Sequence, residues 1–184
     1  MILGSAMGRH LDERLALRAP RLYRWLAKQV EGLTPDSPLR RRALKRMVAR
    51  GWAALSRGDD EVVLLAFDRD VEFNIIGGYM RALGLAERYH GHEGWLEFIG
   101  LWRAEWGGGQ IQHTPETLID LGDRLVMRVT LTARGATSGA DVARTMGIVA
   151  WLADGAVVRQ DNYLEWAECV EALGLDDVAP VASD

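Results

Sequence analysis

Residues 110–164 read QIQHTPETLIDLGDRLVMRVTLTARGATSGADVARTMGIVAWLADGAVVRQDNYL. Apolar side chains recur at every second position through much of this stretch, which is typical of β-strands. Gly122 and Gly155 each stand beside an aspartate in a short turn, and a longer loop at 135–139 lies between them. These breaks predict a four-stranded antiparallel meander. The predicted strands cover about 110–120, 124–134, 139–152 and 156–164.

Helical periodicity dominates the chain before the meander. One apolar stripe predicts a helix over 39–57 and is formed by Leu44, Met47, Val48, Gly51, Trp52 and Leu55. A short apolar helix is predicted over 60–67, and a tryptophan-rich one over 93–106. Between them, alternation from Val71 to Ile75 predicts a strand. With a last short helix over 165–173, this order of elements indicates an α+β fold.

Residues 10–31 form a further helical segment in front of this unit. Pro20 interrupts it, so we expect a break near Ala19, because proline removes a helical hydrogen bond and clashes with the preceding turn. Turn-forming residues follow over 32–38. We therefore divide the chain into a helical arm, a central domain and a tail, over residues 1–38, 39–175 and 176–184.

Charge is distributed unevenly along the chain. Residues 1–57 contain 13 Lys and Arg but only 4 Asp and Glu, whereas the chain as a whole has a net charge of −4. Six basic residues of the 39–57 helix are interpreted as a solvated face, namely Arg40, Arg41, Arg42, Lys45, Arg46 and Arg50. Basic segments can bind nucleic acid, but no recognition motif accompanies this charge, and we expect no nucleic-acid partner.

Composition bounds the class of protein. A single cysteine, Cys169, excludes an internal disulfide, which fits a reducing cytoplasm. No stretch approaches the roughly 20 uninterrupted apolar residues of a membrane span, and the start does not read as a secretory signal. We expect a cytoplasmic location. Gly77-Gly78 and the glycines at 107–109 lack the spacing of nucleotide-binding loops, so no cofactor is predicted.

Several short sequence motifs, considered together in their order along the chain, resemble those of the SnoaL-like branch of the nuclear transport factor 2-like superfamily. They are Arg57-Gly58-Asp59, Asp70-Val71-Glu72-Phe73, Gly91-His92-Glu93-Gly94, Leu121-Gly122-Asp123-Arg124, Arg134-Gly135, Ser138-Gly139, Asp154-Gly155, Tyr163 and Glu171-Ala172-Leu173-Gly174-Leu175. The resemblance spans about residues 39–175. It implies a cone-shaped curved mixed β-sheet with helices on its concave face, a pocket inside the cone, and a homodimer.

The catalytic residues of two known activities of this superfamily are missing. At the positions that correspond to the ketosteroid isomerase base, tyrosine and second acid stand Phe73, Gly51 and Gly147. The Asp-Arg-Asp set of the limonene-type epoxide hydrolases falls on Leu125, Met127 and Asn162. Neither of these two reactions is therefore expected.

Strand alternation together with the resemblance predicts the lining of the pocket. We expect ligand contacts from Phe73, Met127, Val129, Trp151, Gln160 and Asn162. The alternative is that these side chains fill a closed core. Gln160 and Asn162 are the predicted polar pair, and as amides they bind or orient a ligand but transfer no proton at neutral pH.

Two titrating residues are candidates for acid–base catalysis. His92 stands where the 93–106 helix begins, and histidine as a residue type is suited to proton transfer near neutral pH. Asp141 has inward parity on its strand. His90 and His92 could together bind a metal, but no further ligands are evident, and none is predicted.

Two hypotheses for the function follow. In the first, the cone binds a small hydrophobic or polycyclic organic molecule, either as a carrier or as a cofactor-free isomerase, cyclase or hydrolase. In the second, the cone is filled, and the chain is a non-catalytic dimeric interaction module whose basic arm contacts a partner or an anionic surface.

Overall fold

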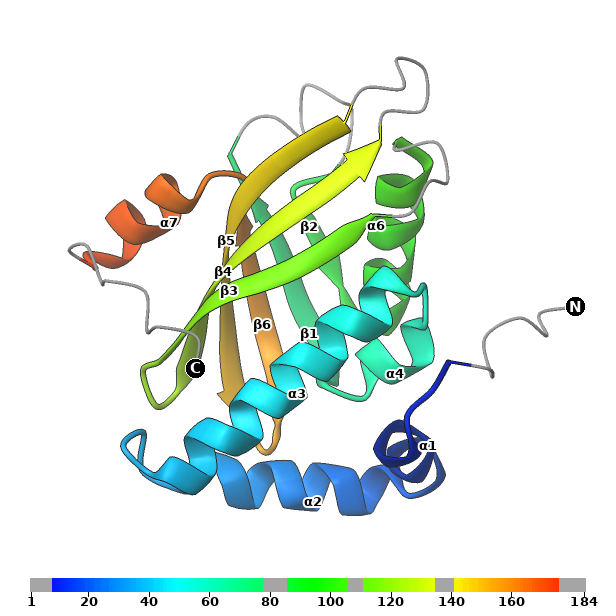
Figure 1. The fold of residues 1–184 in the computed structure, drawn as a ribbon, viewed down its shortest axis with the longest axis vertical. Helices are drawn as coiled ribbons and strands as arrows, with labels where there is room; N and C mark the ends of the chain where they lie inside the picture. Colours follow the sequence, from blue (N-terminus) through cyan, green and yellow to red (C-terminus); the bar gives the residue numbers. More distant parts are fainter. Residues whose placement is uncertain (1–7, 78–85, 106–110, 135–140, 176–184) are drawn as a thin grey trace, which may run out of the picture.

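A computed structural model describes residues 8–77, 86–105, 111–134 and 141–175. Its centre is one six-stranded sheet in the order β2-β1-β6-β5-β4-β3. The strands are β1 (Phe67–Ile76), β2 (Arg88–His90), β3 (Gln112–Asp120), β4 (Arg124–Arg134), β5 (Asp141–Ala153) and β6 (Ala156–Tyr163). β1 and β6 run parallel, and all other neighbours are antiparallel. The predicted α+β fold with a curved mixed sheet is confirmed (Figure 1).

Three helices cover the concave face of the sheet. They are α3 (Pro38–Ser56), α4 (Asp60–Leu64) and α6 (Gly91–Glu105), and α3 crosses the face diagonally in Figure 1. The tryptophan-rich pattern of α6 explains its position, because Trp95, Phe98 and Trp102 all turn into the core against β1. Phe98 is central, with ring centroids 4.8 Å from Phe73 and 5.4 Å from Tyr89.

α7 (Trp166–Leu173) packs on the opposite face of the sheet, so the helices are not all on one side as expected (Figure 1). Cys169 and Trp166 contact β5 at Gly147, where an added Cβ would lie 2.2 Å from Cys169 Cβ. Only glycine permits this close approach. Burial also raises the pKa of the Cys169 thiol to about 11, so the thiol stays protonated at neutral pH.

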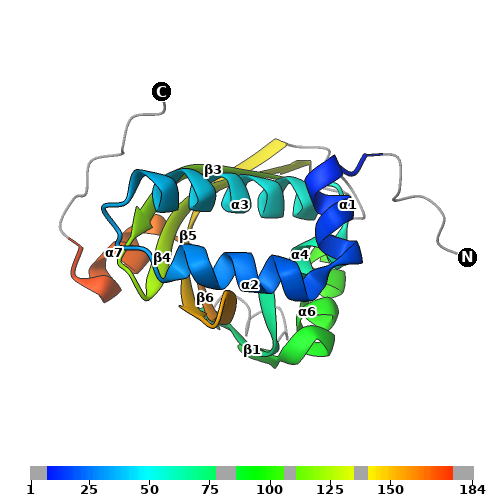
Figure 2. The same ribbon diagram turned by 90° about the horizontal axis from the view of Figure 1, so that it is seen from below.

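The arm forms two helices, α1 (Leu11–Arg18) and α2 (Pro20–Glu31), which separate at Ala19 as Pro20 predicts. α2 lies beside α3 at one end of the molecule (Figure 2). Polar contacts hold it to the sheet, since Arg24 pairs with Asp68 and Lys28 with Asp154. Gly155 of the β5–β6 turn packs directly on the backbone of α2.

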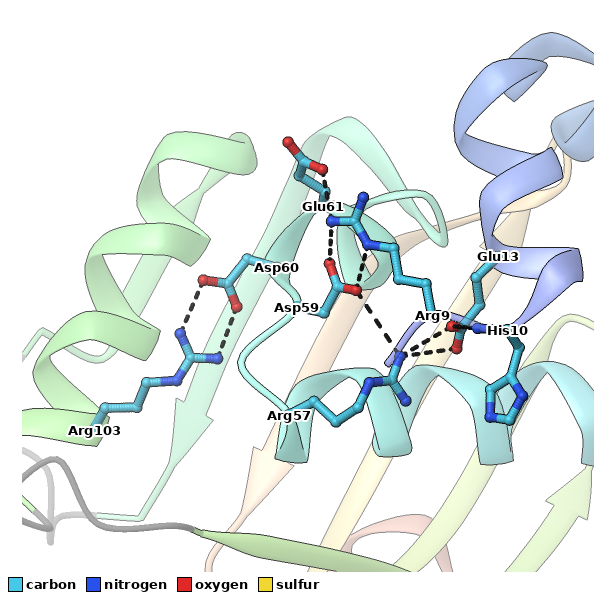
Figure 3. A network of polar contacts seen from close by, with 8 residues as sticks. All are labelled: Arg9, His10, Glu13, Arg57, Asp59, Asp60, Glu61 and Arg103. Carbon is cyan, nitrogen blue, oxygen red and sulfur yellow. Dashed lines mark hydrogen bonds and ion pairs between the residues drawn. The ribbon is translucent and has the colours of Figure 1, made fainter. Parts of the chain in front are cut away.

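A network of ion pairs fixes the start of the arm to the junction of α3 and α4 (Figure 3). Arg9 donates to both carboxylate oxygens of Asp59, at 2.7 Å each, and Arg57 pairs with Glu13 of α1 at 3.0 Å. Asp59 is the N-cap residue of α4, but its side chain makes no capping bond and instead accepts from Arg9. Asp59 and Glu13 are both buried, so the network is structural.

Two further differences from the sequence prediction concern local structure. The strand predicted over 71–75 is longer, Phe67–Ile76, and β2 was not predicted. β2 has only three residues, which is too short for alternation to be recognised. None of the helices described is both long and apolar enough to cross a membrane.

Candidate functional site

A cavity of about 180 Å³ lies between the concave face of the sheet and helices α2, α3 and α6. Its wall is almost entirely apolar. The helices contribute Trp52, Trp95, Phe98 and Trp102, and the strands contribute mostly aliphatic side chains. Five of the six residues that were predicted to contact a ligand line it, namely Phe73, Met127, Val129, Gln160 and Asn162.

The register of the sheet explains why these side chains meet. Asn162 pairs with Ile75 on one side and Ile148 on the other, and Ile148 pairs with Met127. In the next row Gln160 pairs with Phe73 and with Ala150. Residues that pair directly across neighbouring strands project to the same face, so each row points into the cavity as a unit.

Trp151, predicted to contact the ligand, does not line the cavity. It lies on the outer face with Val149, in the cluster beneath α7, and the Arg159 guanidinium stacks 4.7 Å from its ring centroid. Alternation does not mark the inward face of this strand, because β5 is apolar on both faces and Ile148 and Ala150 are the inward residues. On β6 a bulge turns Val157 towards the cavity.

The predicted amide pair forms a fixed hydrogen-bonded chain. Gln160 Nε2 donates to Asn162 Oδ1 at 2.7 Å, and Asn162 Nδ2 donates to the backbone oxygen of Asn74 at 2.9 Å. Both side chains are buried, so the chain holds their orientation. Within the part of the chain that the structure describes, Gln160 Oε1 accepts no hydrogen bond, which leaves one acceptor for a ligand donor.

His113, at the start of β3, is a cavity residue that was missed as a functional candidate. Its ring stacks on Trp52, with centroids 5.4 Å apart, and its backbone nitrogen donates to Ser56 Oγ at 3.0 Å. Its pKa is lowered to about 4, first because burial disfavours the imidazolium and second because Arg103 repels it. The imidazole is therefore neutral at pH 7. The alternation of Ile111 and His113 with polar neighbours could have revealed its inward position.

Glu31, the last residue of α2, is the second titratable side chain of the lining. Its Oε2 accepts a hydrogen bond of 2.6 Å from the backbone nitrogen of Gly155. Glu31 lies near the N-terminal end of α3, whereas His113 bonds to Ser56 at the C-terminal end of that helix. The two groups therefore stand at opposite ends of the cavity, too far apart to act on one small molecule as an acid–base pair.

The two catalytic candidates from the sequence lie elsewhere. His92 begins α6, and its Nε2 is 3.4 Å from the backbone oxygen of Phe67. Asp141 is exposed at the start of β5. Neither lines the cavity, so the geometry does not bring them together with Gln160 and Asn162. Within the described ranges no three His, Cys, Asp or Glu side chains are grouped as metal ligands would be.

The burial of His113 predicts how stability depends on pH. Because its pKa is about 4 in the folded chain and near 6.5 when exposed, the unfolded chain binds more protons between these values. Burial of the neutral imidazole therefore contributes a constant amount to the free energy of unfolding above pH 6.5. This contribution is lost as the pH falls towards 4. As the pH falls from 6.5 towards 4, we expect the free energy of unfolding of the wild type to decrease relative to that of His113→Gln. Urea denaturation at pH 7, 5.5 and 4.5 measures it, and a pH-independent difference would contradict the burial of a neutral imidazole.

The comparison with known families agrees with this architecture. The profile of the SnoaL-like domain matches residues 48–160, more than half of the chain. This chain belongs to the SnoaL-like domain family. The match begins within α3 and ends at Gln160, so it includes most of the cavity wall but not α1 and α2. No sequence among the curated proteins matches the chain.

Solved structures share the fold at low sequence identity. TerC, co-crystallised with polyporic acid, is 23% identical with a TM-score of 0.59, over 70% of this chain and 96% of TerC. An NTF2-like protein of unknown function from Burkholderia pseudomallei is 23% identical with a TM-score of 0.57, over 69% of this chain and 94% of its own. A protein of ketosteroid isomerase-like fold from Catenulispora acidiphila, in complex with trimethylamine, is 14% identical with a TM-score of 0.54. The match covers 73% of this chain and 97% of that protein.

Proposed function

We propose that this SnoaL-like domain binds one small, mainly apolar organic molecule in the cavity between the sheet and α3. The observation that carries the proposal is the cavity itself, about 180 Å³ with an apolar wall and a few inward polar groups. Binding sites for small molecules have this composition. In two of the similar structures the fold was crystallised with a small organic molecule, polyporic acid or trimethylamine.

The volume limits the size of the ligand. An apolar protein cavity of about 150 Å³ accommodates benzene. The cavity here is of similar size, so a single ring with one or two substituents fits it, and the polycyclic ligand expected from the family does not fit the side chains as they stand. Gln160 Oε1 can accept a hydrogen bond from a hydroxyl group on the ring, and the neutral imidazole of His113 can donate one to a carbonyl group.

The polar groups favour binding and orientation over proton transfer. Of the described residues that line the cavity, only Glu31 and His113 titrate. A histidine with a pKa of about 4 is a weak base at neutral pH. An isomerase or hydrolase reaction in this cavity would have to use one of these two side chains. The proposal of a binding protein does not depend on such a reaction. Family resemblance also favours a homodimer, and the single cysteine is consistent with a cytoplasmic setting.

Benzene and phenol are suitable probes, because they differ by one hydroxyl group. We expect both to raise the midpoint of thermal unfolding of the full chain and to perturb methyl signals of the cavity wall. Val129→Phe, which places a ring in the cavity, should abolish both effects. Gln160→Leu should leave benzene binding within about twofold and weaken phenol binding roughly tenfold, the value of one buried hydrogen bond.

Val142→Phe is the matched control, because it adds the same ring at an exposed position on the neighbouring strand. It should bind both probes as the wild type does. The proposal is wrong if neither probe changes the stability or the spectrum of the wild type, or if Val129→Phe binds benzene normally. The second hypothesis, an interaction module, is favoured by a different part of the chain, the arm.

A further inference from the structure

The arm exposes an unusual amount of apolar surface. Among the described residues, six large apolar side chains between positions 11 and 39 are 50–73% exposed, and they are Leu11, Leu15, Leu22, Trp25, Leu26 and Leu39. The other exposed large apolar side chains reach only 36–41%. Single exposed leucines are ordinary, but a concentration in one segment marks an interaction surface.

The exposed residues form stripes along the helices. Leu22, Trp25 and Leu26 are spaced i, i+3 and i+4 on α2, and so occupy one side of that helix. The other side carries Ala27 and Glu31, which line the cavity. α2 therefore packs on the domain through one side and presents its most apolar side to the surroundings. An amphipathic helix of a globular protein usually has the reverse orientation.

Exposed basic side chains accompany these stripes. Arg18 and Arg21 flank the junction of α1 and α2, and Arg41, Arg42 and Lys45 belong to the first half of α3. Within the described ranges none of these five forms an ion pair with a carboxylate, in contrast to the paired Arg24, Lys28 and Arg40 elsewhere in the arm and α3. α3 and α2 lie side by side at the same end of the molecule (Figure 2).

We propose that the exposed sides of α1 and α2 dock on the surface of an anionic lipid bilayer, with the helices lying in the plane of the interface. Leucines and a tryptophan between unpaired basic residues are the composition of such interfacial helices. The apolar side chains enter the boundary between headgroups and acyl chains, where tryptophan is favoured, and the guanidinium and ammonium groups meet anionic headgroups.

Charge favours lipid over a second copy of this chain. In a two-fold dimer through the arm, the basic patch around Arg18 and Arg21 of one copy would lie against or close to the same patch of the other copy. Like charges in an interface are repulsive. A negative bilayer surface is instead complementary to all five basic residues. Because the inner side of α2 lines the cavity, a docked arm would separate the cavity from the lipid by a single helix.

Vesicle co-sedimentation of the full chain tests the proposal. With vesicles of phosphatidylcholine containing one third phosphatidylserine, we expect binding at 50 mM salt that is largely lost at 500 mM, and little binding to phosphatidylcholine alone. Arg18→Gln with Arg21→Gln should weaken binding roughly 10- to 30-fold at low salt. Leu22→Gln with Leu26→Gln should weaken it at least about tenfold.

Leu96→Gln with Leu101→Gln is the matched control, since these two leucines are 41% and 40% exposed on α6, away from the arm. It should bind vesicles as the wild type does. Circular dichroism of each variant should match the wild type, because the replaced side chains are exposed. The proposal would be overturned by no binding to anionic vesicles at low salt, by equal weakening in the α6 control, or by a dimer in sedimentation that Leu22→Gln with Leu26→Gln dissociates. Specific capture of an acidic polypeptide in place of vesicles would overturn it as well.

Discussion

Replacing Arg40 with methionine is expected to lower the free energy of unfolding by about 3–5 kcal/mol, the cost of removing one partner of a buried ion pair. Arg40 is only 1% exposed, in the first turn of α3. Its Nε and Nη2 donate to the two carboxylate oxygens of Asp120, at 2.5 and 2.8 Å. Methionine keeps most of the volume of the side chain, so the loss reports the polar contacts rather than a cavity.

The effect is large because Arg40 also satisfies three backbone carbonyl groups, two around the end of α2 and one in the β3–β4 turn. It donates to the backbone oxygen of Glu31, the last residue of α2, to that of Leu33 just after this helix, and to that of Gly122 in the β3–β4 turn, at 2.6 Å. Without the guanidinium, these carbonyl groups lose their donor and the Asp120 carboxylate loses its charged partner, although the backbone nitrogen of Gly122 still donates to Asp120 Oδ1. An unsatisfied buried polar group costs about 1–3 kcal/mol.

Urea denaturation of Arg40→Met beside Arg41→Met measures this contribution. The neighbouring Arg41 is exposed, so the same substitution there should change the free energy of unfolding by less than about 0.5 kcal/mol. A loss below about 1 kcal/mol in Arg40→Met would show that water replaces the guanidinium and that the connection between arm, α3 and sheet is not structural.

Arg40 also shows where reasoning from the sequence reached its limit. Arg40, Arg41 and Lys45 share the polar side of α3, so the helical pattern alone assigns all of them to solvent. What distinguishes Arg40 is tertiary: Asp120 lies 80 positions further along the chain and meets it only when the sheet has formed. Helical periodicity shows which side chains lie on the same side of a helix. It does not show which polar groups of other elements will contact that side in the folded chain.

The cavity was predictable to the extent that strands alternate. From Met127 onwards on β4 apolar residues alternate with polar ones, and at the end of β6 the two amides alternate with charged residues. Met127, Val129, Gln160 and Asn162 were therefore assigned to the correct face. On β5 both faces are apolar because α7 covers the outer one, and Trp151 was assigned to the wrong face. When a helix from a distant part of the sequence covers the outer face of a strand, the residues of that face are apolar too. The local sequence then does not distinguish the outer face from the inner one.

The division into arm and domain stays a prediction, although the contacts indicate how the two would depend on each other. α2 provides Ala27 and Glu31 to the cavity, while the family match begins only in α3. The part of the chain that is added to the family pattern thus completes the wall of the candidate site. A SnoaL-like domain without this arm would have a cavity more open at the end occupied by α2.

Gly155→Ala is expected to detach α2 from the sheet and to lower the free energy of unfolding by about 3 kcal/mol, the sum of backbone strain and overpacking. Gly155 has φ +76°, a left-handed conformation that a side chain strains. An added Cβ would also lie 2.4 Å from the backbone oxygen of Arg24 and 2.6 Å from the backbone nitrogen of Lys28. These are backbone atoms of a helix, which cannot rotate away, so the whole helix must move and the bond from Gly155 to Glu31 is lost.

Gly174→Ala separates the strain from the clash, because Gly174 has φ +60° and no atom within 4 Å of an added Cβ. It should cost only about 1–2 kcal/mol. Hydrogen exchange across 20–31 gives the decisive comparison: amides of α2 should exchange faster in Gly155→Ala and unchanged in Gly174→Ala. Since α2 closes one end of the cavity, benzene binding should weaken in Gly155→Ala alone. Unchanged exchange in α2 would mean that the turn moves instead of the helix, and that the arm is held by its ion pairs rather than by this contact.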